Sequence, residues 1–181
     1  THEVLSANAI GGMPEVVESG ETFEGNALLK AEALLVQGSP ADLYLADDSG
    51  LEVDHLDGRP GVISARYAGE PCNDDANNER VLREMVGILD DKRSCRFRCV
   101  LALVGASLSK TFSGTCEGTL LHERRGSGGF GYDPLFLPEE SPCTFAEISS
   151  EEKARISHRA RALTKLVSFL REIESSREGR S

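Results

Sequence analysis

Apolar residues recur three or four positions apart in three stretches of the chain. This spacing places them on one face of a helix, and it predicts helices over residues 22–37, 73–89 and 157–174. Thr22 is suited to cap the first of these helices, and Gly38 is suited to end it. The three helices account for less than a third of the chain, so other elements must lie between them.

Short apolar runs and alternating patterns predict strands between the helices. The predicted strands are residues 43–46, 51–53, 95–104, 109–121 and 135–137. Residues 100–104 are continuously apolar, as in a strand that is buried on both sides. Residues 1–21 have the pattern of a loop or a partial strand. Because helices and strands are interspersed along the chain, the sequence predicts one α/β domain.

The composition narrows the class of protein. The 181 residues are 39% hydrophobic and 28% charged, with a net charge of −10, which is typical of a folded soluble domain. No apolar run approaches the roughly 20 residues of a membrane helix. The acidic balance argues against nucleic acid as a partner. The five cysteines form no C-x-x-C pair, and reduced thiols fit a cytoplasmic protein, so we predict that location and no membrane partner.

The charge is divided unevenly along the chain. Residues 1–150 carry a net charge of −13, whereas residues 151–181 carry +3. A solvated helix face and a rim that binds an anion both explain the basic segment, and the composition does not decide between them.

Two adjacent carboxylates, Asp47 and Asp48, follow the predicted strand at 43–46. Ligand sites in α/β sheets favour the carboxyl ends of strands. Paired carboxylates suit Mg²⁺, and a carboxylate can also act as a general base. An ordinary Asp-rich turn has the same residue types, so both interpretations stay open.

A glycine-rich segment spans residues 126–134. Its four glycines allow the backbone to approach a ligand closely, while Phe130 and Tyr132 offer flat surfaces for a base. Asp133 offers an acceptor for the N–H edge of a purine. The segment lacks the pattern of a Walker or a dinucleotide-binding loop. A flexible hairpin loop is the alternative.

Cationic residues gather near the start of the last predicted helix. Ser157 can cap that helix, which would place His158 and Arg159 at its positive end, with Lys153 just before it. Such donors suit phosphate, and a packed or capping histidine is the alternative for His158. Lys30 lies on the first predicted helix, away from its apolar stripe, where a lone surface lysine is the alternative. A metal-binding carboxylate pair, a slot for a base and several cations together describe a nucleoside triphosphate site.

These segments match a known family in order along the chain. The matching residues are 20–31, 46–51, 60–67, 128–134 and 152–159. On these residues the chain resembles the inosine triphosphate pyrophosphatase family, whose bacterial members act on non-standard purine nucleoside triphosphates. The resemblance covers most of the chain.

The resemblance implies an α/β fold with a mixed central sheet flanked by helices, in two lobes with a cleft. It implies hydrolysis of ITP, dITP or XTP to the monophosphate and pyrophosphate, with Mg²⁺ as cofactor, by a homodimer. By position, Asp48 matches the proton acceptor and metal ligand, and Asp47 belongs to the same acidic site. The residues that match substrate contacts are Lys30, Ser49, Phe130, Gly131, Tyr132, Asp133, Lys153, His158 and Arg159.

Two departures from the family pattern leave a second function open. Relatives open with a strand and a phosphate-binding loop, which the single domain of residues 1–181 is expected to lack. Many relatives also carry a metal-binding Glu where this chain has Gly25, and Glu24 is the expected substitute. A nucleotide-binding module without catalysis is therefore the alternative to the enzyme, although the retained Asp48 and Lys153 argue against it.

Overall fold

Four strands form one antiparallel sheet in the order β1-β2-β3-β4, in a computed structural model that describes residues 3–178. The strands are β1 (Tyr44–Val53), β2 (Ser94–Gly105), β3 (Leu108–Leu120) and β4 (Phe136–Pro138). Only two residues connect β2 to β3, which requires the two strands to run in opposite directions. The predicted α/β class is confirmed, but every pairing among these strands is antiparallel, whereas a mixed sheet was predicted.

The β1 strand is continuous where the sequence predicted two short strands separated by a turn. Residues 44–53 pair without interruption with residues 95–104 of β2. Gly50 therefore lies within the strand and faces Arg98 across the pair. A Cβ atom at Gly50 would collide with Ser64 Oγ, so the glycine permits a close approach rather than a turn.

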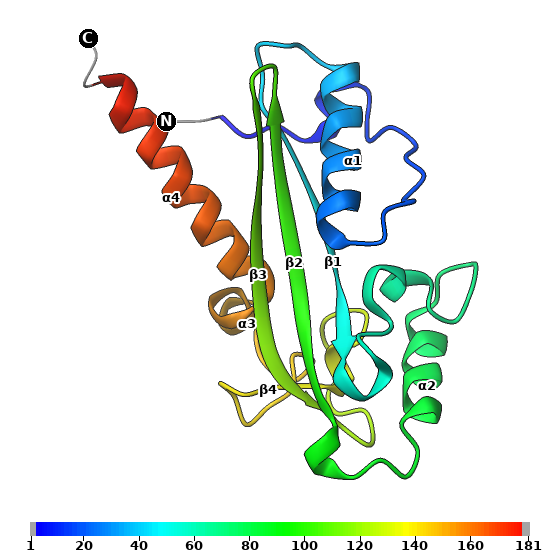
Figure 1. The fold of residues 1–181 in the computed structure, drawn as a ribbon. Helices are drawn as coiled ribbons and strands as arrows, with labels where there is room; N and C mark the ends of the chain where they lie inside the picture. The colour runs from blue at the N-terminus through cyan, green and yellow to red at the C-terminus, as the bar shows by residue number, and fades with distance from the viewer. Residues whose placement is uncertain (1–2, 179–181) are drawn as a thin grey trace.

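Two helices cover opposite faces of the sheet (Figure 1). The α1 helix (Phe23–Gln37) packs against β1 and β2, and the long α4 helix (His158–Glu178) packs against β2 and β3. The remaining helices are α2 (Asp74–Glu84) and α3 (Ser150–Ile156). The 3₁₀ segments are η1 (Ala7–Ile10), η2 (Asp54–Leu56), η3 (Gly61–Arg66), η4 (Asp90–Lys92) and η5 (Asp133–Leu135).

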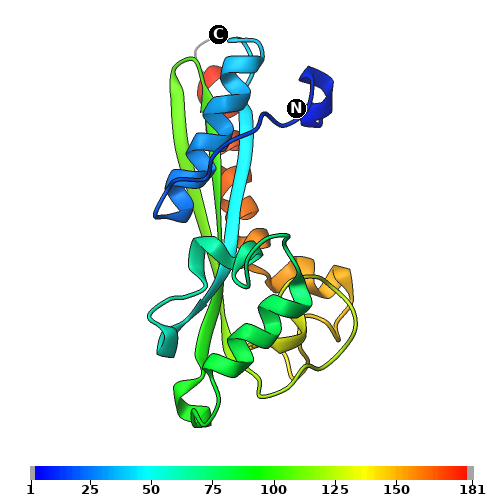
Figure 2. The same cartoon turned by 90° about the vertical axis from the view of Figure 1, so that its right-hand side faces the viewer.

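The second lobe surrounds the other end of the strands. Figure 2 shows α2, η3 and the segment around β4 gathered there, away from α1. Their apolar side chains, Phe136 of β4 among them, share a core with residues at the ends of β1 and β2, including Leu51 and Phe97. The predicted division into two lobes is thereby confirmed. Within residues 3–178, no helix combines the length and apolarity needed to cross a membrane.

Local signals located most helix starts correctly. Thr22 caps α1 by accepting the Gly25 N–H, and Ser157 accepts the Ala160 N–H at the start of α4. The α2 helix ends at Glu84, earlier than predicted, shortly before a glycine with positive φ. The α3 helix was not predicted, although Ser149 and Glu152 have the spacing of a capping box in the sequence.

Candidate functional site

The side chains of Asp47 and Asp48 point to opposite faces of the sheet. Both lie inside β1, where successive residues alternate between faces. Asp48 faces α1, and Asp47 faces the start of α4. The prediction that they form one adjacent pair at a strand end was wrong in this respect, because the strand does not end at residue 46.

Asp48 lies in a buried cluster of polar groups. Its side chain is 8% exposed, and it accepts hydrogen bonds from Lys30 Nζ at 2.8 Å and from Asn26 Nδ2 at 3.3 Å. Lys30 also forms a 2.9 Å ion pair with Glu18, in the segment before α1, and donates to the backbone carbonyl of Asp47 at 3.1 Å. Lys30 therefore joins two carboxylates that are far apart in the sequence.

The electrostatics of this cluster favour a basic carboxylate. Burial raises the pKa of Asp48 above its ordinary value, and the hydrogen bond from Lys30 offsets only part of that rise. Burial alone would lower the pKa of Lys30, but hydrogen bonds to Asp48 and Glu18 outweigh it, so the pKa is raised and the amine stays charged. A charged lysine next to a carboxylate of raised pKa suits proton transfer near phosphate groups.

Glu24, the expected metal ligand near Gly25, forms an ion pair with an arginine of β2. Its carboxylate pairs with Arg98 Nη2 at 2.5 Å, and its role as a metal ligand in place of the Glu expected at Gly25 stays a prediction. Within residues 3–178, no group of three or more Asp, Glu, His or Cys side chains is arranged to hold a metal ion. Asp48 and Glu18 remain as two carboxylates gathered around Lys30.

Asp47 organises the other face of β1. It forms a 2.7 Å ion pair with Arg159 at the start of α4, and it accepts a hydrogen bond from Ser49 Oγ at 3.2 Å. Ser49 shares this face because it is two residues further along the strand. The predicted substrate contacts Ser49 and Arg159 are thus brought together by Asp47.

The glycine-rich segment presents an exposed aromatic ring above a buried ion pair. Phe130 is 64% exposed, and Lys153 Nζ lies 4.6 Å from the centre of its ring. Lys153 also pairs with the buried Asp133 at 2.5 Å, and Asp133 accepts the Phe130 N–H at 2.9 Å. Asp133 thus fixes the loop and Lys153, while Tyr132 is buried and donates its hydroxyl to the Ser64 carbonyl.

His158 is a buried and uncharged histidine. Its ring stacks on Phe97 with centroids 4.9 Å apart, and Nδ1 has no hydrogen-bond partner among the described residues. Burial lowers the pKa of His158 to about 3, with Arg159 and Lys153 contributing in the same direction. The imidazole is therefore neutral at physiological pH and offers one N–H donor.

The low pKa of His158 predicts a loss of stability in mild acid that depends on this residue. Between the folded pKa of about 3 and the unfolded value of 6.5, the unfolded chain binds a proton that the folded protein does not bind. Stability therefore falls as pH drops below 6.5, by about 2 kcal/mol between pH 7 and pH 5. Urea unfolding of His158→Gln at both pH values measures this difference.

The variant is expected to lose about 2 kcal/mol less than the original protein over that interval, because glutamine does not titrate. All other titrating groups are common to both proteins and cancel in the comparison. An equal loss in both would contradict the neutral, buried state of His158.

Sequence reasoning missed two members of the Asp48 cluster. Glu18 precedes α1 in a segment without regular pattern, so only the tertiary contact with Lys30 identifies it. Asn26 is fully buried and joins Asp48 to the Gly20 N–H, which Asn26 Oδ1 accepts at 2.8 Å. A polar residue on the apolar face of α1 was the available signal for Asn26.

Comparisons with known proteins identify the family. Residues 1–169 match the Ham1 family. A dITP/XTP pyrophosphatase of Bacillus licheniformis is 49% identical over 170 residues, covering 93% of this chain and 86% of that protein.

Solved structures are similar as well. A HAM1 protein from Coxiella burnetii superimposes with a TM-score of 0.84 at 38% identity, covering 92% of this chain and 84% of the other. A nucleoside-triphosphatase, dITP/XTP pyrophosphatase, from Mycobacterium abscessus superimposes with a TM-score of 0.78 at 38% identity, covering 93% and 85%. The match to the family and the extent of these similarities show that the chain belongs to the Ham1 family.

Proposed function

We propose that this protein hydrolyses non-standard purine nucleoside triphosphates (dITP, XTP and ITP) to the monophosphate and pyrophosphate. The observation that carries the proposal is the buried Asp48–Lys30 pair in a chain about half identical to a dITP/XTP pyrophosphatase. A carboxylate of raised pKa next to a fixed cation suits attack of water on a phosphate group.

We propose Mg²⁺ as the cofactor, and the donor set supports it. Mg²⁺ is usually bound by one or two carboxylates, with water and substrate phosphates as further ligands. Asp48 and Glu18 supply two carboxylates on either side of Lys30, and Glu18 also pairs with Arg66 at 3.5 Å, whereas Asp47 and Glu24 form closer arginine pairs at 2.7 and 2.5 Å. When bound, the ion would supply positive charge to the phosphate oxygens.

In the proposed reaction, Asp48 accepts the proton of the attacking water, which adds to the α-phosphorus as pyrophosphate leaves. Lys30 stays charged and offsets the negative charge that develops on the phosphate oxygens. Asn26 holds the second oxygen of Asp48 in place. Arg159, fixed by Asp47, lies on the other face of β1 from Lys30, so its proposed contact is with another part of the nucleotide than the phosphate next to Asp48.

The base is proposed to stack on the exposed ring of Phe130, with Lys153 behind it. Hypoxanthine and xanthine carry a keto oxygen at position 6, whereas adenine carries an amino group. The neutral imidazole of His158 has one N–H donor and one acceptor nitrogen, and we propose the tautomer whose N–H faces position 6, which matches the keto oxygen and places a donor against the amino group of ATP.

We further propose that the enzyme acts as a homodimer in the cytoplasm. Leu163 and Val167 of α4 are both about 40% exposed, which supports an apolar contact surface between copies. The five cysteines are free, as expected in a reducing compartment.

One assay tests the proposed activity. The protein is incubated with dITP, XTP, ITP, ATP and GTP, with and without Mg²⁺, and the products are separated by chromatography. We expect monophosphate and pyrophosphate from dITP, XTP and ITP, at rates at least about a hundredfold above those for ATP. Release of inorganic phosphate instead of pyrophosphate would refute the proposed reaction. Binding of dITP without turnover would favour the non-catalytic nucleotide-binding module.

A further inference from the structure

Two side chains of α2 hold the backbone of the glycine-rich loop. Asp74 Oδ2 accepts the Gly131 N–H at 2.6 Å, and Asn78 Nδ2 donates to the Gly131 carbonyl at 2.8 Å. Asp74 and Asn78 are four residues apart, so they share one face of the helix. Both polar backbone groups of Gly131 are therefore fixed by an element more than 50 residues away in the sequence.

Burial sets the orientation of the Asn78 side chain. The residue is 2% exposed, and its Nδ2 atom also donates to the Asp74 carbonyl at 2.6 Å. Because both contacts are with carbonyl oxygens, the amide nitrogen must point toward the loop. Oδ1 has no partner among the described residues, so no competing interaction turns the amide away.

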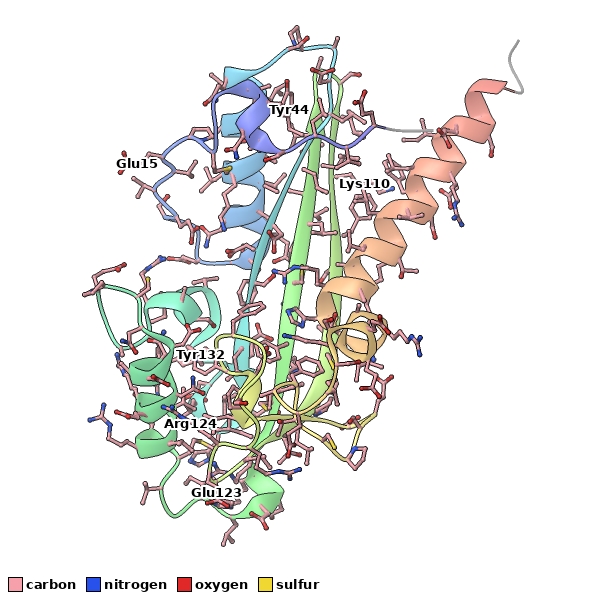
Figure 3. The ribbon with its side chains drawn as sticks, turned by 180° about the vertical axis from the view of Figure 1, so that it is seen from behind. Glu15, Tyr44, Lys110, Glu123, Arg124 and Tyr132 are labelled. Atoms are coloured by element: carbon pink, nitrogen blue, oxygen red, sulfur yellow. The ribbon has the colours of Figure 1, made fainter. Side chains whose placement is uncertain are left out.

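Gly131 is a position where the loop conformation needs support. Its φ of +59° lies in the left-handed region, which glycine adopts readily but does not by itself prefer. Phe130 and Asp133 lie one and two residues away, so the conformation of Gly131 determines where the aromatic ring and the carboxylate stand. Figure 3 labels Tyr132, the residue after Gly131, and Arg124, in the segment before the loop, and both lie near α2.

The helix that holds the loop is itself anchored. Asn77, the neighbour of Asn78, donates to the Ala65 carbonyl at 2.8 Å and accepts the Ala68 N–H at 2.6 Å. It thus fixes α2 to the end of η3 and does not contact the loop. The two adjacent buried asparagines of α2 therefore hold different segments: Asn77 holds η3, and Asn78 holds Gly131.

We propose that Asp74 and Asn78 are positioning residues that preset the glycine-rich loop for the purine base. The inference rests on the proposed function, in which Phe130 stacks against the base. A loop held in its binding conformation loses less conformational entropy when the ligand arrives, so the pair strengthens binding of the base without touching it.

The test compares a ligand that has a base with one that has none. Binding of IMP and of pyrophosphate is measured by calorimetry for Asn78→Ala and for the original protein, with Mg²⁺ present. Loss of the Asn78 hydrogen bond is expected to weaken IMP binding about tenfold and to change pyrophosphate binding less than about twofold. The KM for dITP is expected to rise about tenfold, with kcat within about threefold.

Asn77→Ala is the matched control, since it removes an equally buried asparagine from the same helix. It is expected to destabilise the fold to a similar degree and to leave IMP binding within about threefold. If Asn78→Ala does not fold, Asp74→Ala tests the same role, because Asp74 is exposed and its loss should not unfold the protein. This variant is also expected to weaken IMP binding more than pyrophosphate binding. Glu79→Ala, another exposed acidic residue of α2, is its control.

The outcomes separate the two proposals. Two results would overturn the positioning role while the original protein still hydrolyses dITP. One is equal weakening of IMP binding and pyrophosphate binding in the variants. The other is unchanged IMP binding in Asp74→Ala and in a folded Asn78→Ala. If the original protein neither binds IMP nor hydrolyses dITP, the proposed function itself fails.

Discussion

Replacement of Asp48 by asparagine is expected to lower kcat for dITP about a thousandfold. Asparagine keeps the shape of the side chain and one acceptor for Lys30, but it cannot take a proton from water. General bases typically contribute a factor of about 10²–10⁴, and loss of a carboxylate near the phosphates adds to that effect. Steady-state kinetics with saturating dITP and Mg²⁺ measures the change.

The neighbouring Asp47→Asn variant is the control for this experiment. Asp47 points to the other face of β1 and pairs with Arg159, and both side chains are 42% exposed. We expect a loss of at most about tenfold, since an exposed pair is worth about 1 kcal/mol or less. Comparable losses in the two variants would contradict the separate roles that the alternation of β1 assigns to the two carboxylates.

The Asp48→Asn variant is also expected to stay folded, with a loss of about 1–2 kcal/mol at most, because asparagine offers one oxygen to the two donors Lys30 and Asn26. Burial raises the pKa of Asp48, which means that the folded state disfavours its charge. Removing that charge therefore carries no penalty from lost solvation. A large drop in the urea midpoint would show that the kinetic effect comes from unfolding rather than from the missing base.

Replacement of Arg93 by methionine is expected to reduce the free energy of unfolding by about 3–5 kcal/mol, since three backbone carbonyls lose the guanidinium as a donor. Arg93 is 1% exposed and donates to the carbonyls of Leu120, Met85 and Leu121 at 2.7, 2.9 and 2.8 Å. Methionine fills much of the same space but has no N–H group. Urea unfolding at pH 7 measures the loss.

Arg59→Met is the matched control. The Arg59 side chain is 52% exposed and pairs with Glu84 at the surface, so its loss should cost about 1 kcal/mol or less. Similar losses for the two arginines would mean that the three carbonyls find other partners when Arg93 is absent. That outcome would refute the role of Arg93 as the link between the end of α2 and the end of β3.

The sequence alone was sufficient for most elements and for the family. Helix periodicity and caps predicted α1 and α4, because these signals act between residues a few positions apart. Alternation predicted β2 and β3, and it correctly placed Cys95 and Cys99 on one buried face. The ordered motifs identified the type of protein, which the comparisons confirm.

The error at residues 47–50 has a clear physical cause. Asp, Ser and Gly favour turns, so residues 47–50 resembled the end of a strand. The pairing with β2 overrides that local preference and keeps β1 extended, which sends Asp47 and Asp48 to opposite faces. The turn preference of these residues contributes less free energy than the hydrogen bonds to β2 and the burial of one face of the strand.

What the sequence determined by itself is therefore the α1, α2 and α4 helices, most strands, the family and the residue types of the site. Only the tertiary structure decided which of these residues meet: Glu18 with Lys30 and Asp48, Glu24 with Arg98, and Asn78 with Gly131. The physical reason is that local signals act within one turn or one strand. Contacts between distant segments depend on strand register and on how helices pack, which no local pattern encodes.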